Sequence, residues 1–253
     1  MAQNDIKGKL ALVTGASGGI GSACARSLAA GGAHLALTYS TSLSSLETLV
    51  SSLKSDYPTI HISTHQVDLA SPQLITDLYT SIATAHAGAT VDILISNAGY
   101  GKRIVNVWEI PVEEFDYTLD VNLRASFLLV KGCVEGMKEK KWGRIVFVSS
   151  IAAYGAGLNG CHYAASKGGL TAMMKNLSSH LAQFNISVND IAPAMIGATG
   201  MIPNADTVPG LVDSIPLHRL GEPEECANAV MMFVKTGYIT GQSLLLAGGL
   251  MHK

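Results

Sequence analysis

A tyrosine and a lysine four residues apart are the first candidates for chemistry in this chain. Tyr163 and Lys167 lie in a segment, residues 162–176, whose pattern predicts a helix. Residues at i and i+4 share one helical face, so we expect the ammonium to favour the charged form of the phenol. That contact would lower the phenol pKa from its usual value of about 10. A phenol tuned in this way is a usable general acid near neutral pH.

A serine upstream offers a second polar group for the same chemistry. Ser150 follows an apolar run, residues 145–148, that predicts a strand, and open α/β sheets bind ligands at the carboxyl ends of their strands. We expect Ser150 to donate a hydrogen bond to a substrate oxygen. Alone, Tyr163 and Lys167 would more often mark the edge of an amphipathic helix. The serine and a cofactor motif near the N-terminus favour catalysis instead.

That cofactor motif is a glycine-rich turn. The run Thr14-Gly15-Ala16-Ser17-Gly18-Gly19-Ile20-Gly21 follows a predicted strand, residues 9–14, and opens a predicted helix, residues 20–30. Glycines allow a tight turn, so that backbone N–H groups at a helix N-terminus can face a pyrophosphate. The spacing is T-G-x-x-x-G-x-G rather than G-x-G-x-x-G. We predict a dinucleotide-binding site here.

The end of the second predicted strand bears on which dinucleotide binds. An NAD site of this kind usually has Asp or Glu about 20 residues beyond the glycine turn. Here the first carboxylate is Glu47, inside the next predicted helix, whereas Ser40, Thr41 and Ser42 offer hydroxyl and backbone donors to a phosphate. Arg26 is the only cation nearby in sequence. The missing carboxylate predicts NADPH/NADP+, with NADH disfavoured.

Short apolar runs alternate with stretches of helical period along the whole chain. Such alternation indicates βαβ units, and strands that are apolar on both faces indicate a parallel sheet covered by helices on each side. The expected fold is α/β, a doubly wound Rossmann-type parallel sheet of about seven strands in one domain, residues 1–253. A Gly- and Pro-rich substrate loop is expected near residues 194–212. The predicted strands are residues 9–14, 34–39, 60–67, 91–96, 144–149, 186–191 and 243–246.

Composition narrows the class of partner. The chain has 253 residues, 48% of them hydrophobic, and a mean hydropathy of +0.30, which allows a large core. With 17 basic and 19 acidic side chains and no basic block, it has no electrostatic footprint for nucleic acid or anionic lipid. No apolar run approaches the roughly 18 residues of a membrane span. We expect a small-molecule carbonyl substrate, with no nucleic-acid and no membrane partner.

The cysteines and the first residues predict a cytoplasmic protein. Cys24, Cys133, Cys161 and Cys226 are scattered without a Cys-x-x-Cys pair, which is typical of reduced thiols and not of a disulfide framework or a zinc site. We expect all four to be packing residues and expect no metal site. Residues 1–9 have the composition of neither a signal peptide nor a transit peptide.

Together these motifs resemble the short-chain dehydrogenase/reductase family over nearly the whole chain, closest to its 3-oxoacyl-(acyl carrier protein) reductase and carbonyl reductase branch. The resemblance implies that Tyr163 is the general acid for reduction and that Ser150 orients and polarises the carbonyl. It implies that Lys167 lowers the phenol pKa and holds the nicotinamide ribose. Asn122, in a predicted helix, completes the implied tetrad by anchoring a water that resupplies the proton.

The resemblance also implies the cofactor contacts. Asp68 and Leu69 would flank the adenine, residues 97–99 would line the adenosine ribose, and Ile196 and Thr199 would contact the nicotinamide end. NADPH-dependent relatives share a tyrosine and a nearby serine at the turn that begins with Tyr39. The full set expected to bind NADPH or NADP+ is Gly15, Ser17, Gly19, Ile20, Gly21, Tyr39, Ser40, Thr41, Ser42, Asp68, Leu69, Asn97, Ala98, Gly99, Tyr163, Lys167, Pro193, Ile196 and Thr199.

The family pattern is altered in two places, and three functions stay open. Ala194 replaces the glycine that many relatives have after Pro193, one residue is inserted before Thr199, and Ala247 replaces an aspartate.

The leading function is NADPH-dependent reduction of a ketone, with 3-oxoacyl thioesters as candidates. The alternatives are a reductase or dehydrogenase of a polyol, quinone or secondary-metabolite ketone, and a non-catalytic NADP(H)-binding sensor or scaffold, against which the intact tetrad argues. The resemblance implies a homotetramer.

Overall fold

Seven parallel strands form the centre of the molecule. The computed structural model describes residues 4–155, 158–202, 204 and 210–250. The strand order is β3-β2-β1-β4-β5-β6-β7, and the order reverses between β1 and β4, which creates a crevice at the carboxyl ends of the strands. The predicted doubly wound single-domain fold is therefore confirmed. The strands are β1 (Leu10–Val13), β2 (His34–Tyr39), β3 (Ile62–Gln66), β4 (Ile93–Ser96), β5 (Gly143–Val148), β6 (Ile186–Pro193) and β7 (Ser243–Leu246).

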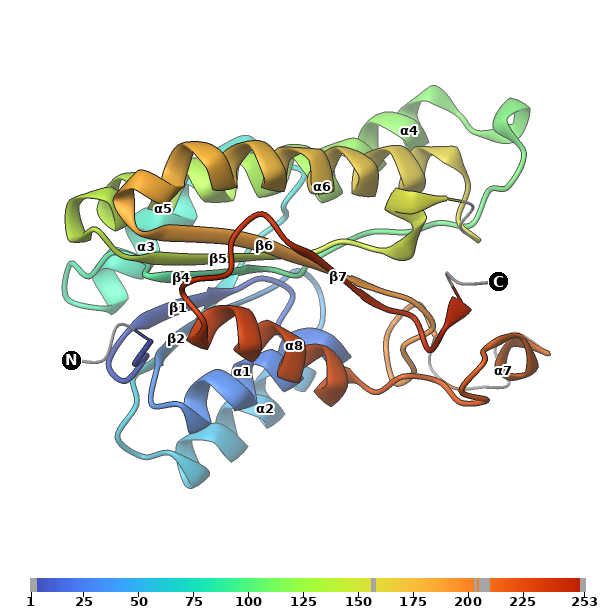
Figure 1. The fold of residues 1–253 in the computed structure, drawn as a ribbon. Helices are drawn as coiled ribbons and strands as arrows, with labels where there is room; N and C mark the ends of the chain where they lie inside the picture. Colours follow the sequence, from blue (N-terminus) through green and yellow to red (C-terminus); the bar gives the residue numbers. More distant parts are fainter. Residues whose placement is uncertain (1–3, 156–157, 203, 205–209, 251–253) are drawn as a thin grey trace.

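Helices cover both faces of this sheet (Figure 1). One layer contains α1 (Gly19–Ala30), α2 (Leu43–Asp56) and α8 (Pro223–Lys235). The other contains α3 (Pro72–Ala85), α4 (Val112–Leu119), α5 (Ala125–Lys140) and α6 (Cys161–Leu181). The shorter elements are η1 (Val107–Glu109), η2 (Asp120–Arg124), η3 (Ile151–Tyr154), η4 (Ala182–Phe184) and α7 (Leu211–Ser214).

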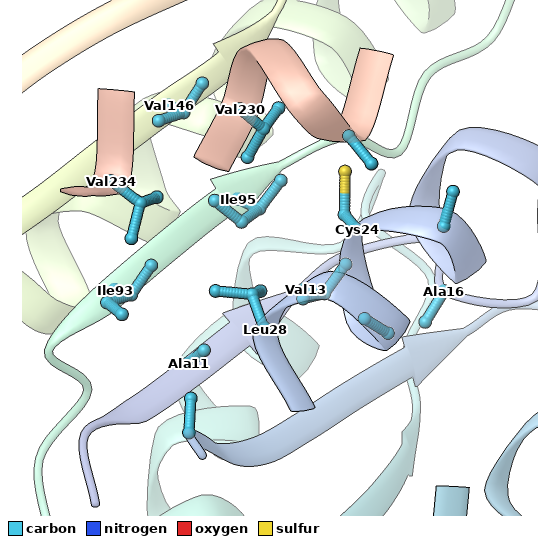
Figure 2. Packing of buried hydrophobic residues seen from close by; sticks show 14 of the residues in the cluster. Ala11, Val13, Ala16, Cys24, Leu28, Ile93, Ile95, Val146, Val230 and Val234 are labelled. Carbon is cyan, nitrogen blue, oxygen red and sulfur yellow. The ribbon is translucent and has the colours of Figure 1, made fainter. Parts of the chain in front are cut away.

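Each helical layer buries its apolar face against the sheet. On one side Leu28 of α1 and Val230 of α8 pack against strand side chains such as Ile95 (Figure 2). On the other side Leu129 of α5 and Met174 of α6 pack in the second cluster of buried residues. Because the central strands are buried on both faces, they appear in the sequence as continuous apolar runs.

Local signals explain where several helices begin. Ser71 caps α3 by accepting a hydrogen bond from Leu74 N, and Pro72 follows in the first turn. At α8, Glu222 and Glu225 form a capping box around Pro223. These capped starts fix the direction in which the helices return to the sheet.

The structure changes some predicted boundaries. The third and fourth strands begin two residues later than predicted, at Ile62 and Ile93, and α6 extends to Leu181. Asn122 lies in the π-helical segment η2, not in an α-helix. Within the predicted substrate loop, α7 begins at Leu211, and residues 203 and 205–209 lie outside the described residues. None of the described helices is both long and apolar enough to cross a membrane.

The prediction that all four cysteines are packing residues is wrong for one of them. Cys24, Cys133 and Cys226 are buried, and burial raises the pKa of each thiol to about 12. Cys161 is exposed because it is the first residue of α6, before the buried face of the helix begins at His162. All four thiols are free.

Candidate active site

The glycine-rich turn joins β1 to α1 and has no room for side chains at two positions. A Cβ on Gly19 would lie 2.3 Å from Ala198 O, and a Cβ on Gly21 would lie 2.3 Å from Gly15 O. Gly15 has φ +64°, a conformation that favours glycine. Helix α1, which is described in full, has no acidic residue in its first turn and no side-chain cap. Its N-terminus therefore fits the pyrophosphate of a nicotinamide dinucleotide.

Hydrogen bonds from neighbouring strands hold this turn in place. Asn97, directly after β4, donates through Nδ2 to Thr14 O at 2.8 Å and to Gly15 O at 3.2 Å. Thr14 Oγ1 accepts from Asn97 N and Ala98 N, both at 3.0 Å. Gly15 N donates to Thr38 Oγ1 at 3.2 Å. The sequence predicted Asn97 and Ala98 as cofactor contacts, and the structure adds that they support the turn, together with Thr14 and Thr38.

The residues predicted to recognise the adenosine end lie after β2 and β3. Tyr39 is half-buried, whereas Ser40, Thr41 and Ser42 are exposed beside the start of α2, and the first turn of this fully described helix has no acidic residue. Arg26, the cation considered for this turn from the sequence, donates instead to Ser52 Oγ at 2.9 Å. After β3, the Asp68 side chain accepts a hydrogen bond from Ala70 N, and Leu69 is buried.

Three members of the predicted tetrad meet at the carboxyl end of β5. Tyr163 and Lys167 are buried on α6, and Ser150 begins η3, where its Oγ accepts from Ala152 N at 3.1 Å. Lys167 Nζ donates to Val148 O at 2.8 Å. A Cβ on Gly99 would lie 3.3 Å from Lys167 Nζ, so the loop after β4 passes close to the ammonium.

The expected lowering of the Tyr163 pKa is not what this structure shows. Burial raises the pKa of Tyr163, and a hydrogen bond with Ser150 only partly opposes that rise. Lys167 Nζ lies 5.7 Å from the centre of the phenol ring and is hydrogen-bonded to the backbone. Burial also lowers the pKa of Lys167 to about 8, against the opposing charge of Asp190. Burial disfavours both charged forms, the phenolate of Tyr163 and the ammonium of Lys167. The i and i+4 spacing of these residues gives no information about their burial.

The fourth member, Asn122, is tied to the loop after β4. Its Oδ1 accepts from Tyr100 N at 2.7 Å, and its Nδ2 donates to Tyr100 O at 2.8 Å and to Ser166 Oγ at 3.0 Å. Asn122 lies in the π-helical turn η2, and π-helical turns inside helices are frequent at functional sites. The side chain thus joins η2 to the loop and to α6, and its role with a proton-supplying water stays a prediction.

The loops around residues 101, 159 and 201 lie close to the phenol of Tyr163. A Cβ on Gly101 would lie 2.8 Å from Asn159 Nδ2, 3.1 Å from Met201 Cε and 3.2 Å from Tyr163 Cε2. His162 is fully buried and donates through Nε2 to Lys102 O at 3.1 Å, which supports a structural role.

The predicted nicotinamide contacts lie on the loop after β6. Pro193 is the last residue of β6, and Ile196 is buried and forms an isolated bridge with Gly221. Thr199 Oγ1 donates to Ile196 O at 3.0 Å. Because a Cβ on Gly19 would meet Ala198 O, this loop lies against the glycine turn, as the prediction requires. Ser17 and Ile20 lie in that same turn and helix start.

A set of buried polar residues behind Lys167 was not predicted from the sequence. Thr171 Oγ1 donates to Asp190 Oδ2 at 2.7 Å and lies 3.0 Å from Ser149 Oγ. Asp190 also accepts from Ser243. One signal for this set was present in the sequence: a carboxylate in the middle of a predicted strand.

Comparisons with known proteins agree with this geometry. Residues 9–208 match the family model described as short chain dehydrogenase. A 3-oxoacyl-[acyl-carrier-protein] reductase, FabG, from Rickettsia felis is 36% identical over 251 residues, which cover 98% of each chain. Dehydrogenase/reductase SDR family member 4 from Bos taurus is 37% identical over 256 residues, which cover 98% of this chain and 88% of the relative.

Solved structures match over almost the whole length. Levodione reductase has a TM-score of 0.89 at 26% identity and covers 96% of this chain and 98% of its own. A blue fluorescent protein from a metagenomic library, solved in complex with NADPH, has a TM-score of 0.87 at 31% identity and covers 97% and 99%. With the family model, the full-length relatives and the glycine turn in agreement, this chain belongs to the short-chain dehydrogenase/reductase family of oxidoreductases.

Proposed function

We propose that this protein uses NADPH to reduce a ketone to a secondary alcohol, with Tyr163 as the general acid. The observation that carries the proposal is the convergence of three groups at the carboxyl end of β5. The buried phenol of Tyr163 is hydrogen-bonded to Ser150, and Lys167 lies on the same helical face. The loop after β4 passes close to Lys167 at Gly99 and lies against the glycine turn at Ala98. Nicotinamide-dependent carbonyl reduction needs an acid at such a place.

Burial keeps Tyr163 in the protonated form, which is the form that a general acid needs for reduction. A buried phenol stays protonated at neutral pH and can give its proton to the carbonyl oxygen. NADPH, when bound, supplies the hydride that adds to the carbonyl carbon. Ser150 Oγ already accepts from Ala152 N, so its own proton is directed toward the phenol or the substrate oxygen. Lys167 then stabilises the phenolate, and a water near Asn122 resupplies the proton.

We propose an open-chain 3-oxoacyl thioester as the first candidate substrate. Its support is the near-complete match to proteins named 3-oxoacyl-[acyl-carrier-protein] reductase. The name of levodione reductase favours a cyclic ketone as the second candidate. Rates of NADPH oxidation with an acetoacetyl thioester, a cyclic diketone and a quinone separate these classes. A thioester rate below the other two would overturn the first choice.

The cofactor preference is proposed from the turn after β2. Ser40, Thr41 and Ser42 are exposed there, without a carboxylate in the first turn of α2, and they can face a 2′-phosphate. We expect kcat/KM for NADPH to exceed that for NADH on one ketone. Ser40→Asp should shift the preference toward NADH through loss of a hydroxyl and like-charge repulsion. A wild-type preference for NADH would contradict the argument.

We also propose a cytoplasmic homotetramer. Apolar side chains are exposed near the start of α4, including Val107, Trp108 and Val112, and Leu244 of the edge strand β7 is also exposed. Two separate apolar regions suit an assembly with two kinds of two-fold interface. Sedimentation should give about four times the chain mass of 26.4 kDa. A stable monomer at micromolar concentration would contradict the proposal.

A further inference from the structure

A carboxylate lies buried inside the sheet, close to the catalytic lysine. Asp190 belongs to β6, is fully buried, and is surrounded along its strand by buried residues. Carboxylates are almost never fully buried unless they are paired. Two hydroxyl groups donate to this one: Thr171 Oγ1 to Oδ2, and Ser243 Oγ to Oδ1. Burial raises the pKa of Asp190, and the two hydroxyl groups together with the charges of Lys175 and Lys167, both on α6, oppose that rise.

The hydroxyl groups form a chain with a fixed direction. An ionised carboxylate only accepts hydrogen bonds, so the single proton of the Thr171 hydroxyl points at Asp190, 2.7 Å away. Thr171 Oγ1 must then accept in its contact with Ser149 Oγ at 3.0 Å, which makes Ser149 the donor. The longer hydrogen bond from Ser149 Oγ to Lys167 O, 3.3 Å, must then share the same single proton as the weaker branch of a bifurcated bond. The chain therefore runs from β5 through α6 to the carboxylate on β6.

The chain of hydroxyl groups ends at Ser149, and the backbone on either side of Ser149 holds the catalytic groups. Ser149 stands between Val148, whose carbonyl accepts from Lys167 Nζ at 2.8 Å, and Ser150. A shift of Ser149 would move both neighbours. The hydroxyl chain thus couples the position of the buried carboxylate to the position of the ammonium and of the serine.

We propose that Asp190 is a positioning residue for the reaction: its buried negative charge keeps the Lys167 ammonium protonated, and its hydroxyl chain fixes the backbone that holds Lys167 and Ser150. The inference rests on the proposed role of Lys167. Among the described residues, Tyr163 of the same helix lies against Lys167, and the charge of Asp190 on β6 acts on it. Burial lowers the pKa of Lys167 to about 8 even though the charge of Asp190 acts in the opposite direction. Without that charge the ammonium would lose its proton at lower pH.

The direct test is a titration of Lys167 by NMR in the full chain without cofactor. Lysine labelled with ¹³C at the ε position reports the charge of each ammonium, and Lys167→Arg assigns the signal. Asp190→Asn keeps the shape of the side chain and removes its charge. We expect its Lys167 pKa to fall by about 1 unit relative to wild type. The matched control, Asp77→Asn, makes the same change on an exposed residue of α3 and should leave that pKa unchanged.

A kinetic readout follows the same variants. The alkaline limb of the pH profile of kcat should move to lower pH in Asp190→Asn and stay in place in Asp77→Asn. A purely structural role would lower kcat at every pH without moving the limb. An unchanged Lys167 titration in folded Asp190→Asn would overturn the inference. If the wild type does not reduce ketones, that result overturns the proposed function instead, because the NMR titration does not depend on turnover.

A second measurement decides the case if Asp190→Asn does not fold. Aspartate labelled with ¹³C at the carboxyl carbon reports whether the Asp190 side chain of the wild type is ionised at pH 7. The inference requires the ionised form, because only a carboxylate supplies the charge and fixes the direction of the hydroxyl chain. A protonated Asp190 at that pH would overturn it.

Discussion

The glycine turn gives the sharpest prediction about cofactor binding. In Gly21→Ala the new Cβ would lie 2.3 Å from Gly15 O, 2.8 Å from Asn97 Nδ2 and 2.9 Å from Gly15 C. The shortest of these is about 1.1 Å less than the 3.4 Å of ordinary contact. The nearest atoms are backbone, so the turn itself must move. Its movement would break the hydrogen bond from Asn97 Nδ2 to Gly15 O.

The size of the effect follows from the cost of overpacking. Extra methyl groups in a packed region cost about 1–3 kcal/mol. If that cost falls on the bound state, the Kd for NADPH rises about 5- to 150-fold. Any part of this cost that destabilises the protein without cofactor lowers Tm by about 2–4 °C per kcal/mol for a chain of this size.

The assay is NADPH binding by calorimetry at a temperature where circular dichroism shows the variant folded. Gly18→Ala is the matched control, because its Cβ would lie 3.5 Å from Gly15 O, an ordinary contact, and φ at Gly18 is −89°. We expect the control to bind NADPH within about twofold of wild type. A folded Gly21→Ala with wild-type affinity, or a Gly18→Ala that binds as weakly as Gly21→Ala, would refute the reasoning.

Three further predictions concern stability and reactivity. Leu28→Ala, in the core of Figure 2, should lower the free energy of unfolding by about 2–5 kcal/mol, measured by urea unfolding; a loss below 1 kcal/mol would contradict the packing. Burial and neighbouring histidines lower the pKa of His86 to about 4, so its contribution to stability is lost as pH falls from about 6.5 toward 4. His86→Gln should flatten that dependence in unfolding curves, and an unchanged slope would count against it. A thiol reagent should label only Cys161 in the native chain and all four cysteines in denaturant; native labelling of buried Cys24 would contradict the structure.

The sheet could be predicted because its signal is local. The middle of β2, residues 35–37, is a buried and continuously apolar run, and the predicted bounds of that strand, residues 34–39, match the structure. The glycine turn was equally visible, since a strand before it and a helix after it define its place. The tetrad was identified through family resemblance, and the fold brings Ser150 to the helix that carries Tyr163 and Lys167.

The electrostatics could not be predicted from spacing. The i and i+4 rule placed Lys167 on the same face as Tyr163 but gave no information about burial, which raises the pKa of the phenol. The partners of Asp190 are distant in sequence: Thr171 lies 19 residues before it and Ser243 lies 53 residues after it. The sequence showed a carboxylate within a predicted strand, and only the fold shows which hydroxyl groups donate to it.

The central claim is that Tyr163 gives a proton to a ketone while NADPH is bound. Tyr163→Phe removes the phenolic oxygen and little volume from a buried site, so packing should be kept. The most direct measurement compares ketone-dependent NADPH oxidation with NADPH affinity for this variant and wild type. We expect kcat/KM to fall by about 100-fold or more while the Kd for NADPH stays within about twofold. Turnover within about tenfold of wild type would contradict the assignment of Tyr163 as the general acid.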